Sequence, residues 1–246
     1  MLKSVNRPRV SALAWVCAAF ALLDHSFSLA HSLRTYGPWM IDMRTAASLL
    51  GWILGMLACV VGVERRDRML TTILLLSAGA GALFTGGEPR FIASQPPSWE
   101  LTAHVLLSMG AAALLFGAAV TAILLFVLDR RLRARRISDL SSTLPPVDQL
   151  ERIMFRLIGS GFALLTLALF TGFVFVTDLF AQHLIHKTVL SVIAWILFGI
   201  LLAGRARFGW RGRPAVRWTL VGFVLLALAY FGSKFVLESV LGRHWG

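Results

Sequence analysis

The sequence contains six histidines, whose ring nitrogens can bind a metal, hold a haem iron or transfer a proton near neutral pH. Their spacing matches no metal-ligand motif, so their chemistry depends on which of them the fold brings together. His25 follows Asp24 inside an apolar stretch, and His104 begins another one. The remaining histidines lie at or beyond the ends of such stretches: His31, His183, His186 and His244.

Seven apolar stretches position these histidines, and each is long enough, or nearly so, to cross a hydrocarbon core that needs about 20 helical residues. They cover residues 10–33, 45–63, 69–86, 101–128, 154–179, 188–203 and 216–241. More than half of all residues are hydrophobic, and the mean hydropathy is positive. The sequence therefore predicts an all-α protein, a polytopic membrane helical bundle of about seven transmembrane helices that forms one domain over residues 1–246.

The segments that flank these stretches alternate in charge, and this alternation predicts the orientation of the bundle. About sixteen Lys and Arg residues precede the first stretch, follow the second and fourth, or separate the last two. Only five lie in the other segments, namely Arg34, Arg44, Arg90, Lys187 and Arg243. By the positive-inside rule the N-terminus is inside and the C-terminus is outside. All six histidines then lie in the outer half of the membrane or beyond it.

The net charge of +12 is interpreted as membrane topology and contact with anionic lipid. No aromatic residues interleave with the basic runs as they do in nucleic-acid modules, so no nucleic-acid partner is expected. Cys17 and Cys59 lie in separate stretches and form no CxxC pair, which argues against thiol chemistry. Residues 28–30 read Ser-Leu-Ala, so a cleaved signal peptide is the alternative interpretation of the first stretch.

Small residues recur at every fourth position within three stretches, a pattern that lets helix backbones approach closely in lipid. We expect these ladders to pack within one bundle, with a dimer interface as the alternative. The three sets are Ala47, Gly51, Gly55 and Cys59; Ser77, Gly81 and Thr85; and Ala113, Gly117 and Thr121.

His104 and His244 are the candidates for a metal centre. His104 enters its stretch at the outer end and precedes a helix face rich in Gly and Ala, which leaves room for a flat ligand. Two facing imidazoles can hold a haem iron from both sides, and the same residues could instead hold Zn or Cu. On the same side, Arg34, Arg44 and Arg90 are either partners for a carboxylate such as a haem propionate or anchors at the membrane interface.

His25 is either a ligand or a hydrogen-bonded core residue, the commoner role of a lone histidine inside a membrane helix. It points about 100° away from its neighbour Asp24, so the two form no dyad by themselves. Lys234 and Glu238 are spaced for an ion pair one helical turn apart. A membrane enzyme that uses Asp24, His25 and Asp178 is a third possibility. Because no acid, base and nucleophile converge, we expect no enzyme.

Several short motifs follow one another in a specific order from His104 to the C-terminus. They are His104-Val105-Leu106-Leu107-Ser108, Met154-Phe155-Arg156, Leu165-Thr166-Leu167 with Thr171-Gly172, Lys187-Thr188-Val189-Leu190-Ser191-Val192-Ile193-Ala194-Trp195, Gly209-Trp210-Arg211-Gly212-Arg213 and Ala229-Tyr230-Phe231-Gly232-Ser233. In this order they resemble the cytochrome c assembly transmembrane protein family, the haem-handling group of CcsA, CcmC and HemX. The resemblance is best over residues 104–246, and before them it rests chiefly on His25.

The resemblance implies a b-type haem at the outer face of a bacterial inner (plasma) membrane, possible contact with another inner-membrane protein, and two histidine ligands. The family's outer histidine at the start of a span corresponds to His104, and its histidine near the C-terminus corresponds to His244. Two positions depart from the family pattern. Residues 180–186 contain no tryptophan where the family has a tryptophan-rich loop, and Ala203 stands where a histidine is expected.

The sequence thus predicts a multi-pass inner-membrane protein related to cytochrome c biogenesis proteins that binds or senses haem and catalyses no turnover. The candidate cofactor-binding residues are His104, His244, His25, Arg44 and Arg90. The alternative is a non-haem accessory subunit of a membrane ion transport or metal-resistance system, in which the histidines are structural. A visible spectrum separates the two, because only the first predicts a haem signal.

Overall fold

The computed structural model describes residues 12–36, 43–63, 68–85, 99–134, 146–175 and 182–232, and it contains no β-strand among them. The described part of each of the seven apolar stretches is mainly helical, which confirms the all-α prediction. The elements are α1 (Ala12–Tyr36), α2 (Met43–Val63), α3 (Arg68–Ala82), α4 (Trp99–Arg133), α6 (Val147–Phe175), α7 (Gln182–Phe208), α8 (Arg213–Ala227) and a π-helical turn, η1 (Leu228–Gly232).

Five of these helices are long and apolar enough to cross a membrane, so the chain is a multi-pass membrane protein. The spans are Arg44–Gly62, Trp99–Arg133, Val147–Phe175, Lys187–Phe208 and Arg213–Tyr230. α3 is apolar but has only 15 residues. α1 has 25 residues, and its mean hydropathy is lowered by polar residues that include Asp24 and His25.

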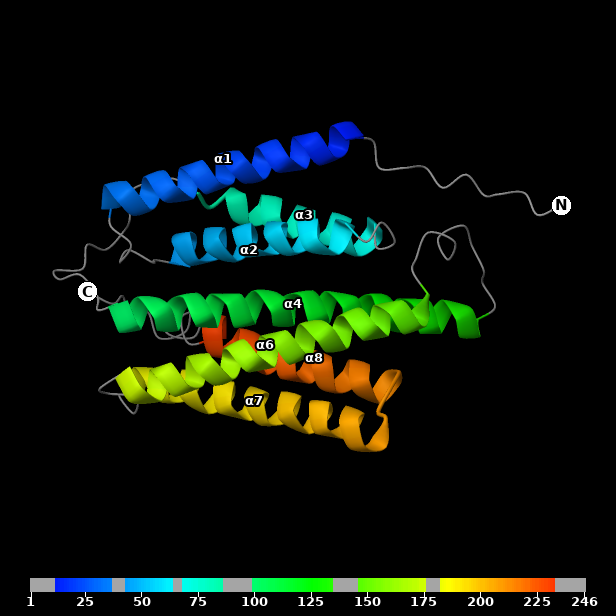
Figure 1. Ribbon diagram of the computed structural model, residues 1–246. Coiled ribbons are helices and arrows are strands. Elements are labelled where there is room, and N and C mark those ends of the chain that lie inside the picture. Colours follow the sequence, from blue (N-terminus) through cyan, green and yellow to red (C-terminus); the bar gives the residue numbers. More distant parts are fainter. Residues whose placement is uncertain are drawn as a thin grey trace.

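The helices run side by side, with α4 between two groups (Figure 1). α1, α2 and α3 lie on one side of α4, and α6, α7 and α8 lie on the other. Gly117 shows how α4 joins the groups, because a Cβ there would contact Leu57 of α2 at 3.0 Å and Leu157 of α6 at 3.4 Å. The buried core consequently follows α4 along most of its length.

The small-residue ladders pack inside the chain, as the sequence predicts. α2 and α3 cross with their backbones in contact, since a Cβ on Gly51 would lie 2.7 Å from the Cα of Gly81. One turn along α2, Gly55 faces Ala78. In α4, Ala113 and Thr121 are completely buried. Glycine is required at the Gly51–Gly81 crossing because no side chain fits between the two backbones.

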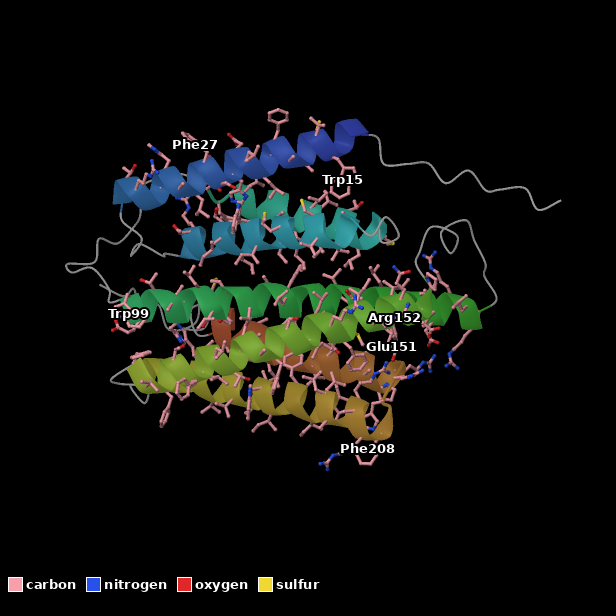
Figure 2. All side chains as sticks on the ribbon, in the orientation of Figure 1. Trp15, Phe27, Trp99, Glu151, Arg152 and Phe208 are labelled. Atoms are coloured by element: carbon pink, nitrogen blue, oxygen red, sulfur yellow. The ribbon has the colours of Figure 1, made fainter. Side chains whose placement is uncertain are left out.

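The end of the bundle where α4 and α7 finish and α6 and α8 begin is called the arginine-rich end, and Figure 2 shows Glu151, Arg152 and Phe208 there, far from Trp99. Glu151 is buried, and its carboxylate accepts a hydrogen bond of 3.1 Å from Arg205. The same guanidinium donates to the carbonyl of Trp210 at 3.2 Å and lies 4.6 Å from the ring centre of Phe155.

The connection between α7 and α8 folds Trp210 back onto the bundle. Gly209 and Gly212 have φ of 64° and 62°, a left-handed conformation that favours glycine. Trp210 covers the space that a side chain on Gly204 would need, and its ring lies 5.8 Å from that of Trp218. The motif of residues 209–213 is therefore a structural turn.

Candidate functional site

His104 lies near the start of α4 and is tied to the end of α6. Its Nδ1 is 2.9 Å from the carbonyl oxygen of Ala168 and 3.2 Å from the hydroxyl oxygen of Thr171. Thr171 donates its own proton to helix carbonyls, so both partners accept from Nδ1 of His104. Nδ1 therefore carries the proton, and in the neutral ring Nε2 keeps its lone pair. Histidine ligands of metals are commonly oriented by such a bond from the other nitrogen.

Gly172 makes room for the His104 ring. A Cβ at this position would lie 3.3 Å from Nδ1 of His104 and 2.9 Å from Cε1, and the second distance is shorter than real Cβ contacts. The packing of α4 on α6 thus presses the imidazole against bare backbone. Thr171 and Gly172, which the sequence presented only as a family motif, both contact the His104 ring.

His104 lines a cavity of about 410 Å³ between α4, α6, α7 and η1, referred to below as the His104 pocket. This volume lies in the range of small-molecule sites, about 300–1,000 Å³. Most of the lining is apolar, with Leu165, Leu169 and Phe173 contributed by α6. The polar lining residues are His104, Ser108, Lys187, Thr188, Ser191 and Tyr230.

Tyr230 closes the pocket from η1. Its hydroxyl is hydrogen-bonded to Ser108, which lies one helical turn after His104 on α4. Single π-helical turns occur frequently at functional sites. Lys187, which is exposed near the start of α7, adds a positive charge to the lining. The pocket thus combines an apolar interior with one histidine, a tyrosine hydroxyl and an amine.

His25 belongs to a different polar cluster. It is buried, and its Nε2 is hydrogen-bonded to the Ser48 hydroxyl at 2.9 Å, which in turn is 2.8 Å from the Thr85 hydroxyl. This chain of hydrogen bonds joins α1 and α2 to the turn that follows α3, and none of its three residues lines the His104 pocket. The structure thus shows His25 in the hydrogen-bonded core role that the sequence allows.

Of the other predicted site residues, the structure describes only Arg34 and Arg44. Arg44 is exposed on α2, Arg34 is exposed on α1, and neither lines the cavity. His244, Arg90, Asp178, Lys234 and Glu238 lie outside the described residues. Within the described ranges, no three His, Cys, Asp or Glu side chains are grouped to hold a metal ion. Sequence reasoning assigned no role to Ser108, Tyr230 or Gly172, although each belongs to a motif of the family.

Four of the six sequence motifs contribute residues to the His104 pocket, one each from α4, α6, α7 and η1. Over residues 13–241 the sequence matches the family described as Cytochrome C assembly protein. The chain belongs to this family. No solved structure matches it.

Three relatives indicate where the chain lies within the family. It is 31% identical to the inner membrane protein YpjD of Escherichia coli (strain K12), over 93% of this chain and 88% of that one. It is 32% identical to a 28.8 kDa protein in the nifR3-like 5' region of Azospirillum brasilense, over 84% and 79%. The cytochrome c biogenesis protein CcsA of Gloeobacter violaceus is 31% identical over 46% of this chain and 32% of its own. The chain is accordingly a multi-pass inner-membrane protein of this family, related to CcsA.

Proposed function

We propose that the chain binds haem in the His104 pocket, with Nε2 of His104 as an axial ligand of the iron, and that it handles or senses haem without catalysing turnover. The observation that carries the proposal is the bond from Nδ1 of His104 to the Ala168 carbonyl. It fixes the tautomer and the plane of the ring, so the remaining nitrogen is ready for a metal.

The residues of the pocket fit haem better than a bare metal ion. Structural Zn sites take four protein ligands and catalytic ones three, whereas the porphyrin itself supplies four of the six ligands of a haem iron. A pocket with one histidine and apolar walls suits the second case. Lys187 offers a positive charge for a propionate carboxylate. When bound, the haem would supply an iron for electron transfer or for binding a further ligand.

The second ligand and the haem type are proposed from the sequence. His244 would be the second histidine to hold the iron, and Arg90 is a further candidate partner for a propionate. The chain has no C-x-x-C-H motif for covalent attachment, which favours b-type haem. The positive-inside rule places the arginine-rich end in the cytoplasm, and this orientation puts the His104 pocket at the outer face.

A visible spectrum of the protein purified after expression with ample haem tests the proposal. We expect a low-spin haem spectrum for the wild type. His104→Ala should lose haem or turn high-spin, and added imidazole should partly restore the low-spin bands, because it supplies the missing nitrogen. His31→Ala is the matched control, since this exposed histidine of α1 does not line the pocket. A wild-type protein that is folded and inserted but free of haem would reject the proposal and favour the accessory-subunit alternative.

His244→Ala then tests the second ligand. If both histidines are axial ligands, this variant should resemble His104→Ala in spectrum and in its response to imidazole. An unchanged spectrum would direct the search to His183 or His25.

A further inference from the structure

The inner face of α1 packs along α2 from Gly62 to Ser48. Trp15 lies against Gly62, and Leu22 lies against Gly55. Nearer the start of α2, the Trp52 indole donates a hydrogen bond of 2.8 Å to the Ser26 hydroxyl. α1 is therefore antiparallel to α2, and residue positions on α1 can be related to depths on α2, which is one of the membrane-spanning helices.

The opposite face of α1 carries a regular row of exposed side chains, which we call the α1 seam: Cys17, Phe20, Asp24, Phe27 and His31. Phe20 is 68% exposed and Phe27 is 74% exposed. Figure 2 shows Phe27 on the side of α1 away from α2 and Trp15 on the side toward it. The residues are spaced alternately by three and four positions, which is the spacing of helices that pack with interlocking side chains along a seam.

Asp24 lies level with the middle of α2, a candidate membrane span. Its neighbours Leu22 and Ser26 contact Gly55 and Trp52, which flank the centre of the Arg44–Gly62 span. A carboxylate facing lipid at this depth is energetically expensive, and such residues usually have a partner. No described residue forms a hydrogen bond or an ion pair with Asp24, and its neighbour His25 is turned inward to Ser48.

We propose that the α1 seam binds a transmembrane helix of another inner-membrane protein, and that this helix carries a lysine or arginine opposite Asp24. The charge decides between a different protein and a second copy. A symmetric pair of α1 helices would bring two Asp24 carboxylates together, and like charges in a medium of low dielectric constant repel strongly. A basic side chain instead converts the buried charge into a paired one. The proposal does not depend on haem binding.

Site-specific photo-crosslinking of the full chain in native membranes tests this inference. A photoreactive residue at Phe20 or Phe27 should give one discrete adduct with the same membrane protein. The same residue at Phe170 is the matched control, because that phenylalanine is similarly exposed, at 66%, on α6. Asp24→Asn should reduce the adduct about tenfold, as expected for loss of a charged hydrogen bond. The amount of inserted protein should not change.

Charge exchange makes the test specific. The lysine or arginine of the crosslinked helix is first mapped by mass spectrometry and then changed to aspartate, which should abolish the adduct. Combining this change with Asp24→Lys should restore the adduct. If Asp24→Lys fails to insert, the yield with Asp24→Asn decides. An adduct no stronger than that at Phe170 would show that the seam faces lipid and would overturn the proposal. So would a Cys17–Cys17 disulfide between two copies formed on mild oxidation, or a crosslinked helix without a basic residue.

Discussion

The imidazole of His104 occupies the space that a side chain on Gly172 would fill. This contact and the bond to the Ala168 carbonyl hold the ring from two directions, so its plane is set by the packing of α4 on α6. A ligand that binds Nε2 meets a ring already in position, which lowers the entropy lost on binding.

Gly172→Ala should weaken haem binding without removing the ligand. The added Cβ would lie 2.9 Å from Cε1 of His104, so the imidazole must move and its hydrogen bond to Ala168 lengthens. We expect less haem per protein and a partly high-spin spectrum. Gly159→Ala, on the same helix, has no atom within 4 Å of the new Cβ and should leave the spectrum unchanged. Identical spectra for the two variants would show that this contact does not orient the ring.

His25→Ala should reduce stability but retain haem. The change removes one of the two hydrogen-bond partners of the buried Ser48 hydroxyl, which keeps its bond to Thr85, so the loss should be about 0.5–1.5 kcal/mol. Thermal unfolding in detergent and the haem content of the surviving folded fraction are the measurements. If the folded fraction lacks haem, His25 is a ligand after all.

Replacing Glu151 should lower the free energy of unfolding more than replacing Asp129, although both carboxylates bind arginine. Glu151 is buried against Arg205, whose side chain is 26% exposed, so Glu151→Ala should lower the free energy of unfolding by about 2–4 kcal/mol. Asp129 binds Arg133 and Arg213 at the surface, and Asp129→Ala should cost about 0–1 kcal/mol. Unfolding curves in detergent with increasing denaturant measure both. Equal losses would mean that burial does not strengthen the Glu151 pair.

Reporter fusions should place the two ends of the bundle on opposite sides of the membrane. Fusions after Arg136 and Arg211 should report the cytoplasm, because the basic residues cluster there. Fusions after Gln95 and Gly246 should report the outer side. A cytoplasmic signal at the C-terminus would contradict the proposed orientation and the assignment of His244.

Hydropathy predicted the helices well, because an apolar run must form hydrogen bonds within itself in lipid and is therefore helical over its whole length. The stretch predicted over residues 101–128 lies within α4, Trp99–Arg133. Hydropathy is a weaker indicator for α1, because polar residues lower the mean hydropathy of this helix although it packs along α2.

The surroundings of His104 could not be predicted in the same way. Its main partner is a backbone carbonyl 64 residues away. Because every residue type has a backbone carbonyl, the sequence does not reveal this bond. The role of Gly172 depends on the distance between α4 and α6. The periodicity of apolar residues in the sequence does not predict this distance. Arg44 was grouped with the histidines because all lie on the predicted outer side. The predicted side of the membrane fixes the depth of a residue but not its position around the bundle. The pocket forms among α4, α6, α7 and η1, and no residue of α2 lines it.

Every residue that lines the His104 pocket in the described part of the chain comes from α4 or later, and none comes from α1, α2 or α3. Substitutions in α1, α2 and α3 therefore change no described lining residue of the pocket. They should leave the pocket intact, provided that the contact between α2 and α4 at Gly117 is kept. Chimaeras that join the first three helices of one relative to the remainder of another would follow the same division.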